Sequence, residues 1–528
     1  MVDDSYQVII VGGGPVGMAL ALELGQRRVR CAVVERRHGV GEIPKGQGLT
    51  QRTLEHFYFW HCVDELKAAR PLRTDYPISG VTGYGNLMSE YTAFPSGREI
   101  VRDYYFQPNY RLPQYRTEQV LRNRVNQLPE VTCLFGWAAT GVKQDDHGVR
   151  VTIESADQPD QVRTLSGQYV VGCDGARSLV REQAGIDRDG DNFDQRMVLA
   201  VFRSSDLNDG LVKRFGERTV YRVLRPEYEG FWMFFGRVDE QNWFFHAPVS
   251  PDEADARPAV HALIEKAAGF PVKCDFAHVG FWDLRVEVAS RYREGRIFIA
   301  GDACHSHPPY GGFGLNSGLE DSANLGWKLA ARLDGWGTDK LLDSYTDERQ
   351  PIFQQTGQLI ADGIRRDAVF LARYSPDRDK EEFGQAWNRI TQKGWSVQSY
   401  EPAYDGSPAV WGPPDGKSGV HGEHSFAARA GHHLAPQPLS SGRNVFEELG
   451  TGFALLAFGA SDEAVKEFQE AAASLDIPLT VVRDSYAGDR QRYEHPWVLV
   501  RPDQFVAWAA DDAPADPAAA LRRVIRAD

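Results

Sequence analysis

A glycine-rich turn close to the N-terminus constrains this chain more than any other feature. Residues 7–11 form a short apolar run rich in β-branched residues, which is typical of a buried parallel strand. The run breaks into the sequence GGGPVG at 12–17, and residues 18–28 predict a helix with small and apolar residues on one face. A second apolar run at 31–34 ends in Glu35. This order of strand, glycine turn, helix, strand and terminal acid predicts a dinucleotide-binding unit.

Three of the four glycines in the turn are required for stereochemical reasons. Gly12 permits the tight turn, Gly14 lets the backbone approach a pyrophosphate, and Gly17 lets the helix lie close to the strand. The helix N-terminus adds free N–H groups and a partial positive charge, which stabilise phosphate. Glu35 is placed to accept hydrogen bonds from an adenosine ribose. The motif leaves open whether the nucleotide is FAD or NAD.

Length, charge and cysteine content limit the alternatives. The chain of 528 residues is longer than one ordinary domain, and its net charge of −14 argues against a nucleic-acid partner. No apolar run approaches the roughly 20 residues of a membrane span, and the acidic N-terminus does not resemble a signal peptide. The six cysteines are scattered without a C-x-x-C pair. We therefore expect reduced thiols in a cytoplasmic protein, with neither disulfides nor a metal site.

Two later segments repeat the pattern of a buried strand followed by an acid–glycine turn. One leads into Cys173-Asp174-Gly175 and the other into Gly301-Asp302. Asp302 is expected at the carboxyl end of its strand, where ligands of open α/β sheets bind, and can hold a ribityl hydroxyl. The glycine-rich turn at 311–318 then feeds a helix whose N-terminus would stabilise the negative charge of a reduced flavin. Together the three motifs favour FAD over an ordinary strand–loop–helix.

These motifs resemble the single-component (group A) FAD-dependent aromatic hydroxylases of the para-hydroxybenzoate hydroxylase type. The glycine turn, the two acid–glycine turns, Pro308-Pro309 and the runs 316–328 and 342–351 carry the resemblance, which covers nearly the whole chain. It is strongest with longer members acting on phenols, phenylpropanoids and polyketide aromatics. The expected fold is α/β, with a Rossmann-like FAD-binding domain (1–76, 111–189, 291–403), an inserted antiparallel-sheet substrate domain (77–110, 190–290) and a thioredoxin-like C-terminal domain (424–528).

The resemblance also implies the cofactor contacts. Lys45 stands where the family often has arginine near the flavin, which keeps the charge but loses the planar fork of donors. Asp174 is implied in cofactor binding and nicotinamide use, although a structural role for this turn carboxylate stays open. The full set of expected FAD contacts is Gly12, Gly14, Pro15, Val16, Gly17, Glu35, Arg36, Lys45, Gln114, Asp174, Asp302, Pro309, Gly312, Gly314, Leu315 and Asn316.

Three aromatic segments at 219–224, 231–235 and 242–246 predict antiparallel strands. The resemblance places their sheet over the flavin, and an apolar cleft with few polar groups suits a planar aromatic substrate. The expected catalytic residues are His246, whose pKa range suits deprotonation of a phenol, and Tyr221. Simple packing of these side chains in the sheet is the alternative. The residues expected to line the substrate cleft are Tyr221, Trp232, Trp243, His246 and Pro308.

The C-terminal part is expected to be a separate unit. A Gly- and Pro-rich stretch at 404–423 predicts a linker, and a strand, helix, strand, hairpin and helix follow it in a thioredoxin-like order. No cysteine lies beyond Cys304, so this unit cannot perform dithiol chemistry. Its expected role is structural, or as a contact between the subunits of a homodimer.

The resemblance implies that NADPH or NADH reduces FAD, that oxygen adds to give a C4a-hydroperoxide, and that a hydroxyl group passes to a phenolic ring. No second G-x-G-x-x-G is visible, so the nicotinamide is expected to bind transiently. The expected partner is a small aromatic substrate, with no nucleic acid and no membrane. Two alternatives stay open: the same fold performing halogenation, Baeyer–Villiger oxygenation or dehydrogenation, and a flavin-bearing scaffold or sensor.

Overall fold

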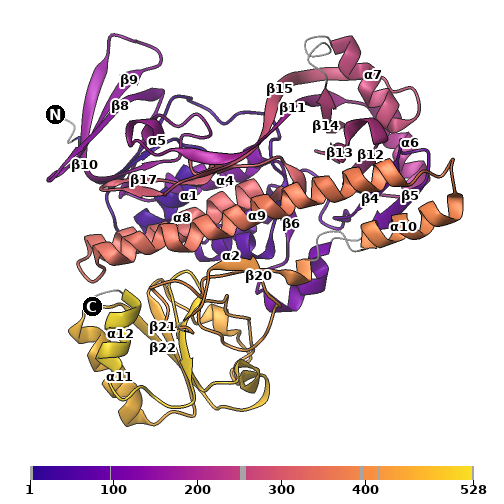
Figure 1. Ribbon diagram of the computed structural model, residues 1–528. Coiled ribbons are helices and arrows are strands. Elements are labelled where there is room, and N and C mark those ends of the chain that lie inside the picture. The colour runs from indigo at the N-terminus through magenta and orange to yellow at the C-terminus, as the bar shows by residue number, and fades with distance from the viewer. Residues whose placement is uncertain (1–3, 95–96, 250–256, 393–396, 414, 526–528) are drawn as a thin grey trace.

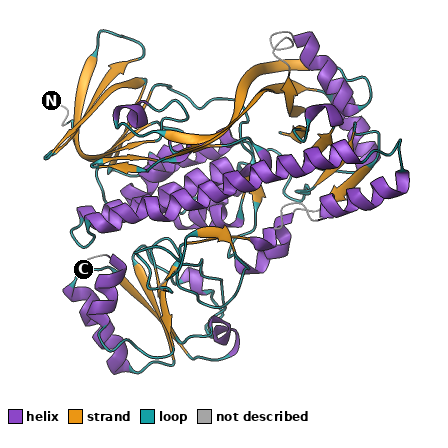
Figure 2. Cartoon of the chain, in the orientation of Figure 1, coloured by secondary structure: helices purple, strands orange, loops and turns teal. Residues whose placement is uncertain are grey.

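The computed structural model describes residues 4–94, 97–249, 257–392, 397–413 and 415–525 (Figure 1). Two large sheets lie side by side, a long helix runs along both, and a smaller third unit packs against the helices that cover the first sheet (Figures 1 and 2). Within the described ranges, no helix combines the length and the hydropathy that crossing a bilayer requires.

The first sheet is built around β1 (Ser5–Val11). Parallel strands follow in the order β7-β2-β1-β10-β17, with β16 at the edge beside β17, and β8 and β9 extend β10 as an antiparallel meander. The chain therefore moves in opposite directions from β1, to β2 on one side and to β10 on the other, which makes the carboxyl ends of β1 and β10 a topological switch point. The other strands are β2 (Cys31–Glu35), β7 (Val131–Phe135), β8 (Trp137–Asp145), β9 (Gly148–Ser155), β10 (Val162–Gly172), β16 (Arg293–Glu294) and β17 (Ile297–Ile299).

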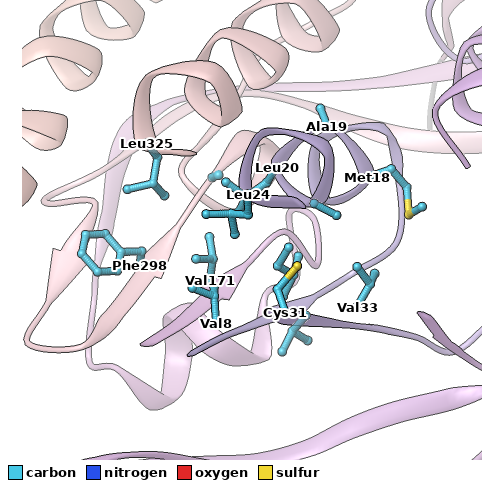
Figure 3. Close-up of a cluster of buried hydrophobic side chains, with 14 of the residues drawn as sticks. Val8, Met18, Ala19, Leu20, Leu24, Cys31, Val33, Val171, Phe298 and Leu325 are labelled. Carbon is cyan, nitrogen blue, oxygen red and sulfur yellow. The ribbon is translucent and has the colours of Figure 1, made fainter. Parts of the chain in front are cut away.

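Helix α1 (Pro15–Gln26) covers this sheet and is buried along nearly its whole length, because almost all of its residues are small or apolar. Leu20 and Leu24 point towards Val8 and Val171 of the central strands, and all four are fully buried (Figure 3). The helices that surround this core or connect its strands are α2 (Gln51–Phe59), α3 (Val63–Ala68), α4 (Gln114–Val125), α5 (Leu179–Gln183) and α8 (Phe313–Leu333).

The second sheet has eight strands in the order β18-β15-β11-β14-β13-β12-β4-β5. All neighbours are antiparallel except β12 and β4. One face packs against α6 (Ser205–Phe215) and α7 (Arg257–Ala268), and the other is turned towards the first sheet. The strands are β4 (Gly80–Tyr84), β5 (Tyr91–Phe94), β11 (Arg188–Arg203), β12 (Val220–Leu224), β13 (Trp232–Arg237), β14 (Asn242–Val249), β15 (Asp275–Ala289) and β18 (His305–Ser306).

Helix α9 (Asp339–Arg373) spans both sheets (Figure 2), and α10 (Lys380–Gln392) follows it. The C-terminal unit has strand order β22-β21-β23-β24, with only β21 and β22 parallel, which is a thioredoxin-like arrangement. Its elements are β21 (Phe453–Phe458), α11 (Asp462–Ser474), β22 (Leu479–Asp484), β23 (Trp497–Val500), β24 (Val506–Ala510) and α12 (Pro517–Ile525).

The stretch expected to be a linker is packed rather than free. β19 (Tyr400–Ala403) and β20 (Gly419–His421) form a small sheet beside α9. Between them Tyr404 is fully buried, stacks on Phe505 at 4.1 Å and accepts a hydrogen bond from Arg349 at 3.2 Å. Because a large aromatic side chain stabilises this position, the Gly and Pro content marks tight turns here and not a mobile connection.

Candidate active site

A cavity of about 1880 Å³ is lined by residues from both sheets and from α8 and α9. Its nucleotide end is the edge of the first sheet, and its other wall is the inner face of the second sheet. The residues at the nucleotide end are Gly14, Pro15, Val16, Lys45, Gly46, Gln114, Cys173, Asp302, Pro309, Gly311, Gly312, Gly314 and Leu315.

The first glycine turn is shaped for close backbone approach. A Cβ atom at Gly12, where φ is +106°, would lie 2.3 Å from the carbonyl oxygen of Cys173, and one at Gly17 would lie 1.9 Å from that of Gly12. A Cβ atom at Gly14 would meet nothing within 4 Å, so this backbone faces open space. Because α1 begins at Pro15, its free N–H groups point to the same space, which fits a pyrophosphate.

Glu35 and Arg36 lie beside this turn but outside the cavity lining. The Glu35 carboxylate accepts hydrogen bonds from the N–H groups of Gly13 at 2.8 Å and Arg37 at 2.9 Å, which hold it at the end of β2. Arg36 is exposed. Arg122 of α4, which the sequence did not single out, donates to the carbonyl oxygen of Gly13 at 3.3 Å and braces the turn from behind.

Gln114 and Lys45 lie close together at the nucleotide end of the cavity. The N–H of Gln114, the first residue of α4, donates to the carbonyl oxygen of Gly46 at 2.8 Å. Lys45 is exposed and lines the cavity beside it. The pair expected from the sequence is therefore adjacent in space.

The two acid–glycine turns differ in what their carboxylates do. Asp302 lines the cavity, whereas Asp174 does not. Asp174 accepts hydrogen bonds from the Ser178 hydroxyl at 2.5 Å and the Val180 N–H at 3.2 Å, at the start of α5. Burial raises its pKa despite these bonds. The geometry favours the structural role for Asp174 that the sequence left open.

The turn before α8 brings a helix N-terminus to the cavity. Gly311 and Gly312 have φ values of +76° and +70°, and α8 begins directly after them. Gly312, Gly314 and Leu315 line the cavity, as does Pro309, whereas Pro308 is buried outside the lining.

Asn316 joins the loops around this helix start. Its side chain donates to the carbonyl oxygens of Gly48 at 2.9 Å and Gly312 at 2.6 Å, and accepts from the N–H of Thr50 and the hydroxyl of Thr53. Asn316 does not line the cavity. Its hydrogen bonds fix the loop that does line the cavity, and its expected contact with the flavin stays a prediction.

A buried ionic cluster behind this loop escaped the sequence reasoning. Asp321 lies 2.7 Å from His305 Nε2, and accepts hydrogen bonds from Arg349 at 2.8 Å and from the N–H of Gly301 at 3.0 Å. Burial alone would raise the pKa of Asp321, but His305 and Arg349 outweigh it and lower the pKa. The cluster fixes the turn that carries Asp302. The only feature of the sequence that points to this cluster is Asp321, an acidic residue within the glycine-containing segment that forms α8.

Strand alternation separates the expected substrate residues into two groups. Trp232, Phe234, Phe244 and His246 face the cavity. Tyr221 and Trp243 are fully buried on the opposite face, in the hydrophobic cluster beneath α6 and α7. The structure therefore removes these two from the cleft that they were expected to line, because neighbouring residues of a strand point to opposite faces.

His246 is an isolated polar side chain in the apolar wall. It stacks on Phe234 at 4.8 Å, and within the described ranges neither ring nitrogen has a hydrogen-bond partner. Burial lowers its pKa to about 3, so the imidazole is neutral at physiological pH. It offers one donor and one acceptor to a ligand.

Arg111, Arg222 and His307 are among the polar residues of the lining that were not expected. The Nδ1 atom of His307 contacts the carbonyl oxygen of Pro308, and its Nε2 atom has no hydrogen-bond partner among the described residues. The sequence signal for Arg222 is a charge inside an otherwise apolar and aromatic strand. In the described part of the chain, no group of three His, Cys, Asp or Glu side chains could hold a metal ion.

Known proteins share this architecture. The family profile "FAD binding domain" matches residues 5–359, and "Aromatic-ring hydroxylase, C-terminal" matches 427–527. The chain is 30% identical to aklavinone 12-hydroxylase from Streptomyces purpurascens over 100% of this chain and 99% of that protein. It is also 30% identical to 4-methyl-5-nitrocatechol 5-monooxygenase from Burkholderia sp., over 99% and 98% of the two chains.

Solved structures agree with the sequence relatives. A ternary complex of aklavinone-11 hydroxylase with FAD and aklavinone superposes with a TM-score of 0.82 at 27% identity, covering 99% of both chains. The flavin-dependent monooxygenase PieE, in complex with FAD and substrate, gives a TM-score of 0.86 at 26% identity, covering 99% of both chains. The chain therefore belongs to the FAD-dependent aromatic-ring hydroxylases, and it is a flavoprotein monooxygenase.

Proposed function

We propose that this enzyme hydroxylates a phenolic ring of a polyketide-type, multi-ring aromatic compound. The observation that carries the proposal is one continuous cavity joining the nucleotide end to the aromatic face of the second sheet. Its volume of about 1880 Å³ exceeds the roughly 300–1000 Å³ of an ordinary ligand pocket, so a dinucleotide and a multi-ring substrate can share it. Among the relatives, aklavinone 12-hydroxylase supports a multi-ring substrate, and 4-methyl-5-nitrocatechol 5-monooxygenase supports action on a phenolic ring.

FAD, when bound, supplies the reactions with NAD(P)H and oxygen. We propose that the backbone at Gly14 and the N-terminus of α1 hold its pyrophosphate, with Glu35 and Arg36 near the adenosine. Asp302 would accept hydrogen bonds from the ribityl chain. The expected contacts that also line the cavity are Gly14, Pro15, Val16, Lys45, Gln114, Asp302, Pro309, Gly312, Gly314 and Leu315.

The second sheet positions the ring and excludes water. Trp232, Phe234 and Phe244 offer apolar surface for a planar ring. We propose that neutral His246 orients the phenol hydroxyl by a hydrogen bond. A base role would require a pKa closer to the working pH than about 3. We assign no catalytic role to Tyr221, which faces the opposite side.

The test is NAD(P)H consumption by the FAD-loaded enzyme, with the product mass measured in parallel, against monocyclic and multi-ring phenols. We expect multi-ring phenols to stimulate consumption and to gain one oxygen atom. Stimulation by monocyclic phenols alone would contradict the substrate class. Oxidation of substrates without oxygen transfer would favour a dehydrogenase and overturn the proposal.

We further infer a cytoplasmic enzyme, because its six cysteines are all free and its reductant is an intracellular coenzyme. A small aromatic substrate is its proposed partner, and assembly as a homodimer stays a prediction. Light scattering on the FAD-loaded protein would decide the subunit number.

A further inference from the structure

Glu320 is a buried acid on α8, close behind the turn that lines the nucleotide end of the cavity. It is the eighth residue of this helix, which begins at Phe313, so it lies about 10 Å along the axis from the helix start. Its side chain is only 10% exposed. Salt screens a buried charge weakly, so a charge at this position acts on a ligand at the start of α8.

Glu320 stays charged, and its compensation comes from α2. Burial alone would raise the pKa of Glu320, but Arg52 and His56 outweigh burial and hold the pKa well below its usual value. The neighbouring acid, Asp321, has a cation of its own, because Arg349 donates to it at 2.8 Å. Without Arg52, Glu320 would therefore keep only His56 as a direct partner, and the charge of a histidine depends on pH.

Arg52 binds Glu320 with two of its donors. Its Nε and Nη2 atoms donate to the two carboxylate oxygens at 3.1 and 3.3 Å, which is the paired geometry in which a guanidinium binds a carboxylate most strongly. His56, one turn further along α2, contacts the same carboxylate at 2.8 Å. Between them in the sequence, the Thr53 hydroxyl donates to Asn316. One turn of α2 thus holds both the charge of Glu320 and the residue that fixes the cavity-lining turn.

The C-terminal unit fixes Arg52 from the other side. The Arg52 guanidinium donates through Nη1 to Gln504 Oε1 at 2.9 Å and through Nη2 to the carbonyl oxygen of Asp503 at 2.6 Å. Gln504 has a φ of +59°, a left-handed conformation that residues other than glycine rarely adopt. Glu55, 3.4 Å from Arg52, is itself held by His433 at 2.7 Å. The position of Arg52 is therefore set by α8 and by the C-terminal unit together.

We propose that Arg52 is a positioning residue for the flavin: by compensating Glu320, it keeps the start of α8 favourable for reduced FAD. A reduced flavin carries more negative charge than an oxidised one, and charges near its ring nitrogens tune its electronic properties. An uncompensated Glu320 would oppose that negative charge, whereas an uncompensated Arg52 would attract it. The pair therefore sets the redox potential of the bound flavin. This inference rests on the proposed position of FAD, and not on which aromatic compound is hydroxylated.

The test measures the midpoint potential of the bound FAD, by equilibrium reduction against a reference dye. Arg52→Gln should lower the potential by at least about 30 mV, which corresponds to a tenfold fall in the affinity for reduced FAD relative to oxidised FAD. Glu320→Gln should raise the potential, because it leaves Arg52 uncompensated. The double variant Arg52→Gln/Glu320→Gln should return the potential close to that of the unaltered enzyme. Arg52→Lys, which keeps the charge but not the fork of donors, should shift the potential less than Arg52→Gln does.

Arg332→Gln is the matched control, because it makes the same change of charge in the last turn of α8. The side chain of Arg332 is 40% exposed and lies 3.7 Å from Asp339, so water screens its charge. This variant should leave the potential unchanged. Retained FAD and a cooperative thermal transition establish that each variant is folded. If Arg52→Gln loses FAD, Glu320→Gln and the double variant decide the question.

Opposite shifts in the two single variants distinguish charge compensation from structural damage, because damage to the turn would move both potentials in the same direction. Unchanged potentials, or shifts of one sign in both variants, would reduce the pair to a structural contact and overturn the proposal. So would an equal shift in Arg332→Gln. Oxygen transfer to phenols by the unaltered enzyme would still leave the proposed function standing, and its absence would reject that function whatever the potentials are.

Discussion

Gly14 and Gly17 lie three residues apart in one turn, yet an added methyl group meets different surroundings at each. At Gly17 it would lie 1.9 Å from the carbonyl oxygen of Gly12, which is backbone and cannot move aside. At Gly14 it would meet no protein atom within 4 Å, and the φ of −74° suits any residue. Only the bound cofactor would make Gly14 a crowded position.

We therefore predict different failures for the two alanine variants. Gly17→Ala should destabilise the protein without cofactor by about 1–3 kcal/mol, as overpacking does. Gly14→Ala should keep the melting temperature of the cofactor-free protein but weaken FAD binding at least roughly tenfold, a loss of about 1.4 kcal/mol. Thermal unfolding without FAD and fluorescence titration with FAD separate the two effects. Unchanged FAD affinity in Gly14→Ala would contradict the pyrophosphate assignment.

His432 supplies a pH-dependent contribution to stability. Its ring nitrogens lie 3.2 Å from Glu401 and 3.0 Å from Asp405. Burial alone would lower its pKa, but the two carboxylates outweigh burial and raise the pKa to about 9. Because the pKa is higher in the folded state, the stabilisation is fully present below about pH 6.5, the unfolded value, and is lost as the pH rises through 9.

Replacing His432 by Gln should consequently cost up to about 3 kcal/mol at pH 6 and little above pH 9.5. Chemical denaturation of both proteins at the two pH values measures the difference. His147, an exposed histidine on the turn between β8 and β9, provides the control as His147→Gln, which should change stability at neither pH. A pH-independent loss for His432→Gln would indicate that packing, and not charge, is responsible.

At the scale of the strand, alternation decides which aromatic residues meet the substrate. Tyr221 and Arg222 are neighbours on β12, but Tyr221 lies beneath α6 and α7 while Arg222 lines the cavity. Tyr221→Phe removes one hydrogen bond, from the hydroxyl to the carbonyl oxygen of Arg218 at 3.2 Å. We expect a loss of about 1 kcal/mol in stability and unchanged kcat/KM.

Phe234→Leu is the counterpart on the cavity face, since Phe234 pairs with Arg222 across the strands. This variant should raise KM for an aromatic substrate several-fold. In urea denaturation, the fall in its free energy of unfolding should be smaller than the fall caused by removing the whole aromatic side chain. A large fall in kcat/KM for Tyr221→Phe would show that the buried face reaches the reaction after all.

The same alternation explains what sequence reasoning could and could not predict. The strands around Tyr221, Trp232 and His246 were predicted correctly, because apolar periodicity is local. Which face meets the cavity depends on packing against α6 and α7, so Tyr221 and Trp243 were placed on the wrong side. The glycine turn could also be predicted from the sequence, because its conformation depends on residues that are adjacent in the chain. That Arg222 faces the cavity could not be predicted, because the cavity is formed by residues that are distant from it in the sequence.

At the scale of the molecule, a buried ionic cluster joins the C-terminal unit to the FAD-binding core. Glu348 of α9 contacts Arg501 at 2.7 and 2.8 Å and Lys328 of α8 at 2.7 Å, and Arg501 also contacts Asp503. The side chains of Glu348, Lys328 and Arg501 are fully buried. Burial alone would raise the pKa of Glu348, but Arg501 and Lys328 hold it well below its usual value. The unit is thus attached by charge as well as by apolar contact.

Glu348→Gln should destabilise the whole chain by about 3–5 kcal/mol at pH 7, because two buried cations lose their shared carboxylate. The matched control is Asp362→Asn on the exposed side of the same helix, whose ion pair with Arg365 should be worth less than about 1 kcal/mol. Because the folded pKa of Glu348 is depressed, the difference from the unaltered protein should be full above about pH 4.5 and shrink as the pH falls.

A double-mutant cycle determines whether this cluster acts as one unit. Arg501→Gln takes one cation from Glu348 and from Asp503, whereas Glu348→Gln leaves Lys328 without its carboxylate, so each single change leaves a different charge unpaired or underpaired. Together they remove both members of the pair, and the combined loss should fall short of the sum by roughly 1–3 kcal/mol. Urea denaturation followed by tryptophan fluorescence is suitable, since Trp327 donates to Asp503 at 3.1 Å within the cluster. Strict additivity would mean that the two charges are stabilised independently of each other.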